Sequence, residues 1–292
     1  MEPIRPSWSS WSFLLYAGGL TVLAAALGWL AYLSSRDGDA AYAGWALLVL
    51  AVLQGAALSL RRRHRIIAGV FAFSAVVIFA AFVAALWTWF GWLHGVPSSP
   101  FAGFHIGRLT LELLTLMAAL AALRWHRFPL LVLPASVVAW VFVTDVLSGG
   151  GDWSAVVTFA AGLVFMAFAV SVDGGRRRAY GFWLHVASGL TIGGSLIHFL
   201  GHGNTGWVLV AVGGVLYAAL AESLGRSSWA VLGAAGILLA AAHIAISLSR
   251  VHVEVLSLSP SVQGRGWAAP LVFLVAGGVL CGLGGVLARR PR

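Results

Sequence analysis

Ten strongly apolar stretches, separated by short polar turns, run through the chain. Most of them are close to the roughly 20 residues that an α-helix needs to cross the hydrocarbon core of a bilayer. The pattern predicts an all-α, polytopic bundle of about ten spans, folded as a single transmembrane domain over residues 1–292. The predicted spans are residues 11–33, 41–60, 66–93, 105–123, 128–147, 153–171, 179–203, 206–223, 228–249 and 267–288.

Arginine residues gather in every second turn between these stretches. One predicted side of the membrane carries Arg5, Arg61, Arg62, Arg63, Arg65, Arg124, Arg127, Arg176, Arg177, Arg178, Arg226, Arg289, Arg290 and Arg292. Only four of the 18 basic residues fall on the other side. Because cytoplasmic loops retain basic residues, both termini are expected in the cytoplasm, with the arginines against anionic headgroups of the plasma (inner) membrane.

Composition agrees with a membrane protein and narrows its chemistry. The chain is 60% hydrophobic and 9% charged, whereas soluble domains are roughly 25% charged. The net charge of +9 follows from the arginine topology, so we expect no nucleic-acid partner. The single cysteine, Cys281, excludes an intrachain disulfide, and the absence of lysine, typical of a GC-rich bacterial genome, excludes a lysine Schiff base. With no GxSxG, HExxH or P-loop motif, a non-enzymatic protein is favoured.

The chain also repeats itself. The run FLLYAGGLTV from Phe13 resembles WLHVASGLTI from Trp183, and Pro100 and Pro260 precede equivalent spans. Spans 1–4, residues 11–123, thus map onto spans 7–10, residues 179–288, and spans 5–6 form an inserted hairpin. Because the shift is an even number of helices, the two repeats are predicted to have the same orientation.

Polar residues inside the spans are the candidate functional groups, because burying them in a bilayer is costly. One face of the seventh span carries them at spacings of three and four residues: Ser188, Thr191, Ser195, His198 and His202. The fourth span has Arg108 and Glu112 on one face, the ninth has His243, and Asp145 ends the fifth. We expect these faces to converge, because unpaired polar groups do not face lipid.

The favoured function is binding or transport of a small polar solute or ion through an outward-facing cavity between spans 4, 5, 7 and 9. Glu112 and Asp145 would supply negative charge, Arg108 an orienting cation, and the histidines neutralisable donors. The predicted binding residues are Arg108, Glu112, Asp145, Ser195, His198, His202 and His243.

Two alternatives remain open at this stage. His198 and His202 form an HxxxH pattern that presents two imidazoles from adjacent helical turns, and His243 offers a third ligand. The same histidines would then bind a divalent metal, or ligate haem, in a membrane redox enzyme or subunit. The second alternative is a structural subunit of a larger complex, whose polar stripe packs against a partner helix.

Cysteine-accessibility labelling tests the predicted orientation. Cysteines at positions 38, 204 and 256, in a chain whose Cys281 is replaced, are expected to react with an impermeant reagent from outside only. The reason is that these positions lie in the arginine-poor turns. Labelling of position 204 from the cytoplasmic side contradicts the topology.

Overall fold

The computed structural model describes residues 38–62, 65–93, 104–175 and 178–249, together with a few positions between 251 and 279. In this part of the chain, eight helices are long and apolar enough to cross a membrane. The protein is therefore a multipass, membrane-spanning helical protein. The first predicted span, 11–33, and all but five positions of the last, 267–288, lie outside the described residues, so the four-helix repeat stays a prediction.

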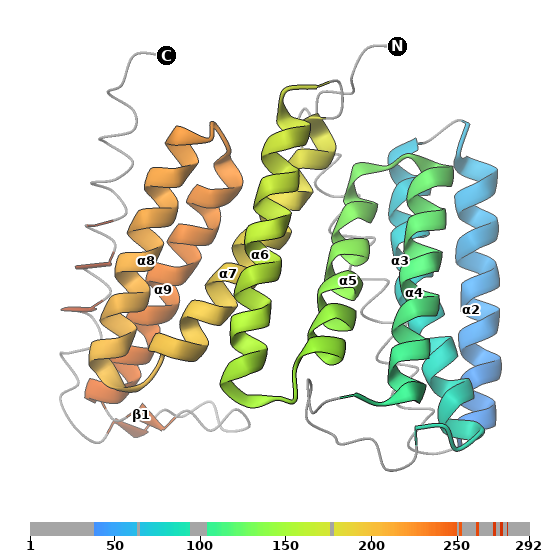
Figure 1. The fold of residues 1–292 in the computed structure, drawn as a ribbon, viewed down its shortest axis with the longest axis horizontal. Helices are drawn as coiled ribbons and strands as arrows, with labels where there is room; N and C mark the ends of the chain where they lie inside the picture. The colour runs from blue at the N-terminus through green and yellow to red at the C-terminus, as the bar shows by residue number, and fades with distance from the viewer. Residues whose placement is uncertain are drawn as a thin grey trace. The chain divides into compact units, whose positions relative to one another are not determined.

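The described helices follow the predicted spans closely, with ends that differ by a few residues. A 3₁₀ turn, η1, leads into α5, and two short strands pair antiparallel after α9 (Figure 1). The elements are α2 Asp39–Leu60, α3 Arg65–Trp89, α4 Ile106–His126, η1 Pro129–Leu131, α5 Val132–Leu147, α6 Gly151–Asp173, α7 Arg178–Leu200, α8 Gly203–Ser223, α9 Ser227–Ser249, β1 Val251–His252 and β2 Ser261–Val262.

The seventh span ends earlier than predicted, and this changes the position of one histidine. α7 stops at Leu200, and the backbone N–H of Gly201 donates to the carbonyl of Ile197. His202 has an extended backbone and precedes the first residue of α8. The prediction that His198 and His202 lie on adjacent turns of one helix is therefore wrong. The physical cause is the glycine-rich turn: a Cβ at Gly206 would collide with the carbonyl of Leu200.

The chain divides into two compact units. The first contains residues up to 157 and residues 167–187, and thus α2 to α5 with parts of α6 and α7. Ala46 and Leu53 of α2 pack on Ala75 and Ile78 of α3. A second cluster joins α3 to α4 and α5 through Ala72, Val76, Ala119, Leu131 and Ala135. Adjacent helices of this unit are packed antiparallel, as the short turns predict.

The arginine-bearing turns of the first unit lie at one end. Arg61, directly after α2, shares a surface hollow with Arg124 and Arg127 at the end of α4. The Tyr180 hydroxyl, near the start of α7, donates to the carbonyl of Arg127 over 2.8 Å. The turns after α2, α4 and α6 are thus neighbours, as the arginine alternation requires.

The second unit contains residues 158–166 and 188–292, and its tightest contact joins α8 to α9. Gly214 and Gly233 face each other so closely that a Cβ on Gly214 would lie 2.6 Å from the carbonyl oxygen of Gly233. Small residues allow this approach of two membrane helices. Trp229 of α9 is fully buried and meets the ring of Tyr217 edge-on at 4.9 Å. The Tyr217 hydroxyl in turn donates to the carbonyl of Gly189 in α7.

A matched pair of substitutions tests the α8–α9 contact. Gly214→Ala should lower the free energy of unfolding by about 1–3 kcal/mol, because the new methyl group forces two backbones apart. Gly213→Ala is the control, since its Cβ would meet nothing within 4 Å. Thermal unfolding of the purified protein, followed by tryptophan fluorescence, compares them. Equal Tm values for the two variants would show that the helices do not pack at Gly214.

Candidate functional site

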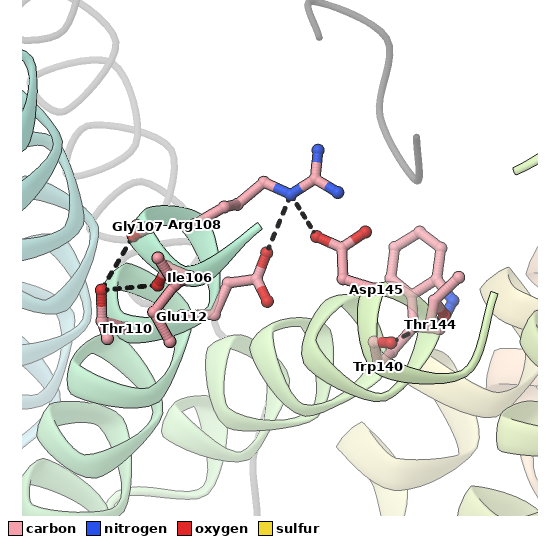
Figure 2. A network of polar contacts seen from close by, with 8 residues as sticks. All are labelled: Ile106, Gly107, Arg108, Thr110, Glu112, Trp140, Thr144 and Asp145. Atoms are coloured by element: carbon pink, nitrogen blue, oxygen red, sulfur yellow. Dashed lines mark hydrogen bonds and ion pairs between the residues drawn. The ribbon is translucent and has the colours of Figure 1, made fainter. Parts of the chain in front are cut away.

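Three of the predicted site residues meet between α4 and α5. The Arg108 Nε atom lies 2.5 Å from Oδ2 of Asp145 and 3.8 Å from Oε1 of Glu112 (Figure 2). Arg108 and Glu112 belong to the first two turns of α4, and Asp145 to the last turn of α5. Because the two helices are antiparallel, these positions fall at the same end of the helix pair. We call these three residues the ion triad.

The start of α4 is held in place by residues in the last turn of α3 and just after it. A Cβ at Gly107 would collide with the carbonyl of Trp92, so the turn passes directly against the helix beside Arg108. The Trp87 Nε1–H donates to the Thr110 hydroxyl over 2.9 Å. That hydroxyl lies within hydrogen-bonding distance of the carbonyls of Ile106 and Gly107 (Figure 2). These contacts fix the backbone from which the Arg108 side chain extends.

Asp145 sits on a helix end that is equally well defined. The Thr144 hydroxyl donates to the carbonyl of Trp140 (Figure 2). The backbone N–H of Ser148 donates to the carbonyl of Thr144. Trp153, at the start of α6, donates its indole N–H to the carbonyl of Leu147. This hydrogen bond joins the start of α6 to the end of α5. Asp145 is only 1% exposed to solvent.

Charge is unevenly distributed in the ion triad. One guanidinium faces two carboxylates, and the Glu112 residue is only 6% exposed. Oε2 of Glu112 and Oδ1 of Asp145 are buried and accept no hydrogen bond from any described residue. Removing an ionised carboxylate from water costs several kcal/mol unless charges and hydrogen bonds compensate it. When all three groups are ionised, the triad has one negative charge in excess.

The other predicted site residues lie in the second unit, where the hydroxyl stripe serves helix packing. The Ser188 hydroxyl donates to the carbonyl of Gly162 in α6 over 2.8 Å. Thr191 and Ser195 donate to carbonyls within α7, at Ser188 and Thr191 respectively. Each hydroxyl thus has a backbone acceptor. This is the arrangement expected of a close helix–helix contact in lipid.

The three histidines of the predicted site are exposed and differ in their surroundings. The His243 ring stacks on Trp207 at 4.5 Å and 17°, and His198 meets Phe199 edge-on at 5.6 Å. His202 occupies the turn before α8. Within the described residues, no group of three or more histidine, cysteine, aspartate or glutamate side chains is arranged to hold a metal ion. The structure therefore offers no support for the metal alternative in this part of the chain.

One buried polar pair was not predicted. His185 is fully buried, and its Nε2 lies 2.9 Å from Oδ2 of Asp173 at the end of α6. Gly181 leaves room for this carboxylate, since a Cβ there would collide with Oδ1. Asp173 directly precedes a turn of glycines and arginines, and an acidic residue at such a position is expected to face solvent. The sequence feature that indicated this pair was His185, because a histidine within a membrane span needs a polar partner.

Substitutions within the ion triad test its charge coupling. Arg108→Gln should destabilise the protein by about 3–5 kcal/mol, because it leaves two buried carboxylates without the guanidinium. Adding Asp145→Asn to the same chain should recover part of that loss, since only one buried carboxylate then remains. The measurement is Tm in a double-substitution cycle, with exposed Arg62→Gln as the control. Strictly additive losses would contradict the coupling.

Comparison with protein-family descriptions, with curated proteins and with solved structures finds no match for this chain, and no family is assigned to it.

Proposed function

We propose that the protein binds a small monovalent cation, or a polar solute that carries one positive charge, at the ion triad and passes it across the membrane. The observation that carries the proposal is that two buried carboxylates share one guanidinium, which leaves one negative charge in excess when all three groups are ionised. A ligand with one positive charge brings the three ionised side chains to neutrality. A divalent ion would instead leave a positive excess, so the charge count favours a monovalent ligand.

The atoms available in the triad also favour a cation. Oε2 of Glu112 and Oδ1 of Asp145 are acceptors without a described hydrogen-bond partner. Carboxylate oxygens suit hard cations and N–H donors, including ammonium groups and, at the smallest limit, a proton. Arg108 repels a second cation and orients the Asp145 carboxylate. The guanidinium thereby limits the site to one ligand.

The remaining predicted residues take different roles in this proposal. The imidazoles of His198, His202 and His243 are exposed polar groups of the second unit and do not belong to the ion triad. The Ser195 hydroxyl already donates to a carbonyl, and we assign it to packing. The ligand is expected to enter from the outer side of the plasma membrane, because the triad lies at the start of α4, away from Arg124 and Arg127 at the other end of the helix.

Cation-dependent stability tests binding. The purified protein in nanodiscs of zwitterionic lipid is titrated with sodium or methylammonium chloride, with choline chloride keeping the ionic strength constant. We expect Tm to rise with either small probe, because a ligand that binds the folded state stabilises it. Glu112→Gln removes the excess charge and should weaken the apparent affinity at least about 30-fold. Glu222→Gln, an exposed glutamate in α8, is the matched control.

Uptake of the same probes into proteoliposomes tests passage. Uptake that depends on Glu112 and Asp145, and not on Glu222, supports transport. A response to sodium and methylammonium that is unchanged in Glu112→Gln and Asp145→Asn would overturn the proposal, leaving the triad a structural ion network. A pH-sensitive dye inside the vesicles identifies the case in which the cation is a proton.

A further inference from the structure

A second charged feature lies at the opposite end of α4 from the ion triad. There, a hollow of about 400 Å³ opens between the carboxyl ends of α2 and α4, which lie at the same end of the first unit (Figure 1). We call it the basic hollow. Its lining residues are Arg61, Ala121, Arg124, Trp125 and Arg127.

The three arginines are brought together by the way in which α2 and α4 end. Arg61 follows the last residue of α2, and Arg124 lies in the last turn of α4. Arg127 adopts a left-handed backbone with φ 49°, and its N–H donates to the carbonyl of Leu123. This conformation is unfavourable for a residue that has a Cβ atom. The hydrogen bond from Tyr180 to the Arg127 carbonyl helps to hold it.

Positive charge in the basic hollow is not balanced by any carboxylate in the part of the chain that the structure describes. Among the described residues, no carboxylate lies within ion-pair distance of Arg61, Arg124 or Arg127. Two helix ends contribute roughly half a negative charge each. Three guanidiniums against about one unit of dipole charge leave a net charge of about +2. The basic hollow therefore attracts an anion.

The surroundings of the hollow identify the kind of anion. Guanidinium groups bind phosphate oxygens in a bidentate manner. On the same face of α4, at spacings of four, four and three residues, an apolar stripe runs from the hollow toward the other end of the helix. It consists of Trp125, Ala121, Met117 and Leu114, and Trp125 and Met117 are 57% and 59% exposed. A free phosphate ion has no apolar surface to place against this stripe, whereas the acyl chain of a phospholipid can pack along it.

We propose that the basic hollow is a binding site for an anionic phospholipid in the arginine-side leaflet. The phosphate meets Arg61, Arg124 and Arg127, and an acyl chain lies along the α4 stripe. The indole of Trp125 borders the glycerol region, as tryptophan does at membrane interfaces. This site shares no residue with the ion triad, and its ligand has the opposite charge. The two proposals are therefore independent, and one can be disproved while the other stands.

Lipid titration of the full chain tests the site. The protein in a non-ionic detergent is titrated with phosphatidylglycerol, phosphatidylcholine or inorganic phosphate, and Tm and lipid retention in native mass spectrometry are measured. We expect phosphatidylglycerol alone to raise Tm and to remain bound. Arg61→Gln, Arg124→Gln and Arg127→Gly should each weaken its apparent affinity about fivefold, and the triple variant about a hundredfold.

Two controls keep the result interpretable. Arg62→Gln removes an equal charge from an exposed neighbour that does not line the hollow, and should leave the affinity unchanged. Arg127→Gly suits the left-handed backbone and should fold at least as well as the unchanged chain. An equal loss in Arg62→Gln, or undiminished binding to the triple variant, would overturn the proposal. Stabilisation by inorganic phosphate equal to that by phosphatidylglycerol would overturn the assignment of a lipid.

Discussion

A bilayer core supplies no hydrogen-bond partners, so each polar group that this chain carries into the membrane must find its partner within the protein. Tyr217 and Ser188 follow this rule, since their hydroxyls donate to the carbonyls of Gly189 and Gly162 in neighbouring helices. Trp87 donates to a threonine hydroxyl at the start of α4. Several buried polar atoms of the described residues lack such a partner, among them the hydroxyls of Ser148 and Ser228, and the only carboxylate oxygens in this group belong to Glu112 and Asp145 of the ion triad.

The two ends of α4 carry opposite excess charges, negative at its start and positive at its end. At its start, two carboxylates are buried against one arginine. The low polarity of the buried site strengthens the electrostatic interaction between these groups and a bound ion. At its end, an excess of arginine is exposed at a hollow, where headgroups and water screen it. A single helix of 21 residues therefore presents an acidic interior site and a basic surface site.

The sequence predicted the helices well because about 20 consecutive apolar residues have few alternatives to a membrane helix. It predicted helix ends less well: hydropathy continues through Gly201, but the chain turns there, and His202 leaves α7. The Arg108–Glu112 pair follows from helical spacing, and Asp145 from the antiparallel order of α4 and α5. The pairing of His185 with Asp173 depends on tertiary packing that no spacing encodes. The roles of the Ser195 hydroxyl and its neighbours were also open, because hydroxyls serve packing and ligand binding equally well.

The contact between Gly214 and Gly233 has a mechanical consequence for α8 and α9. Each glycine lies against the carbonyl of the other, and the flanking positions one turn away on α8 are Val210 and Ala218. Sliding one helix along the other would bring a side chain against a backbone oxygen, which close-packed interiors do not tolerate. The α8–α9 hairpin therefore resists sliding of one helix along the other, and we expect the two helices to move together as one rigid body.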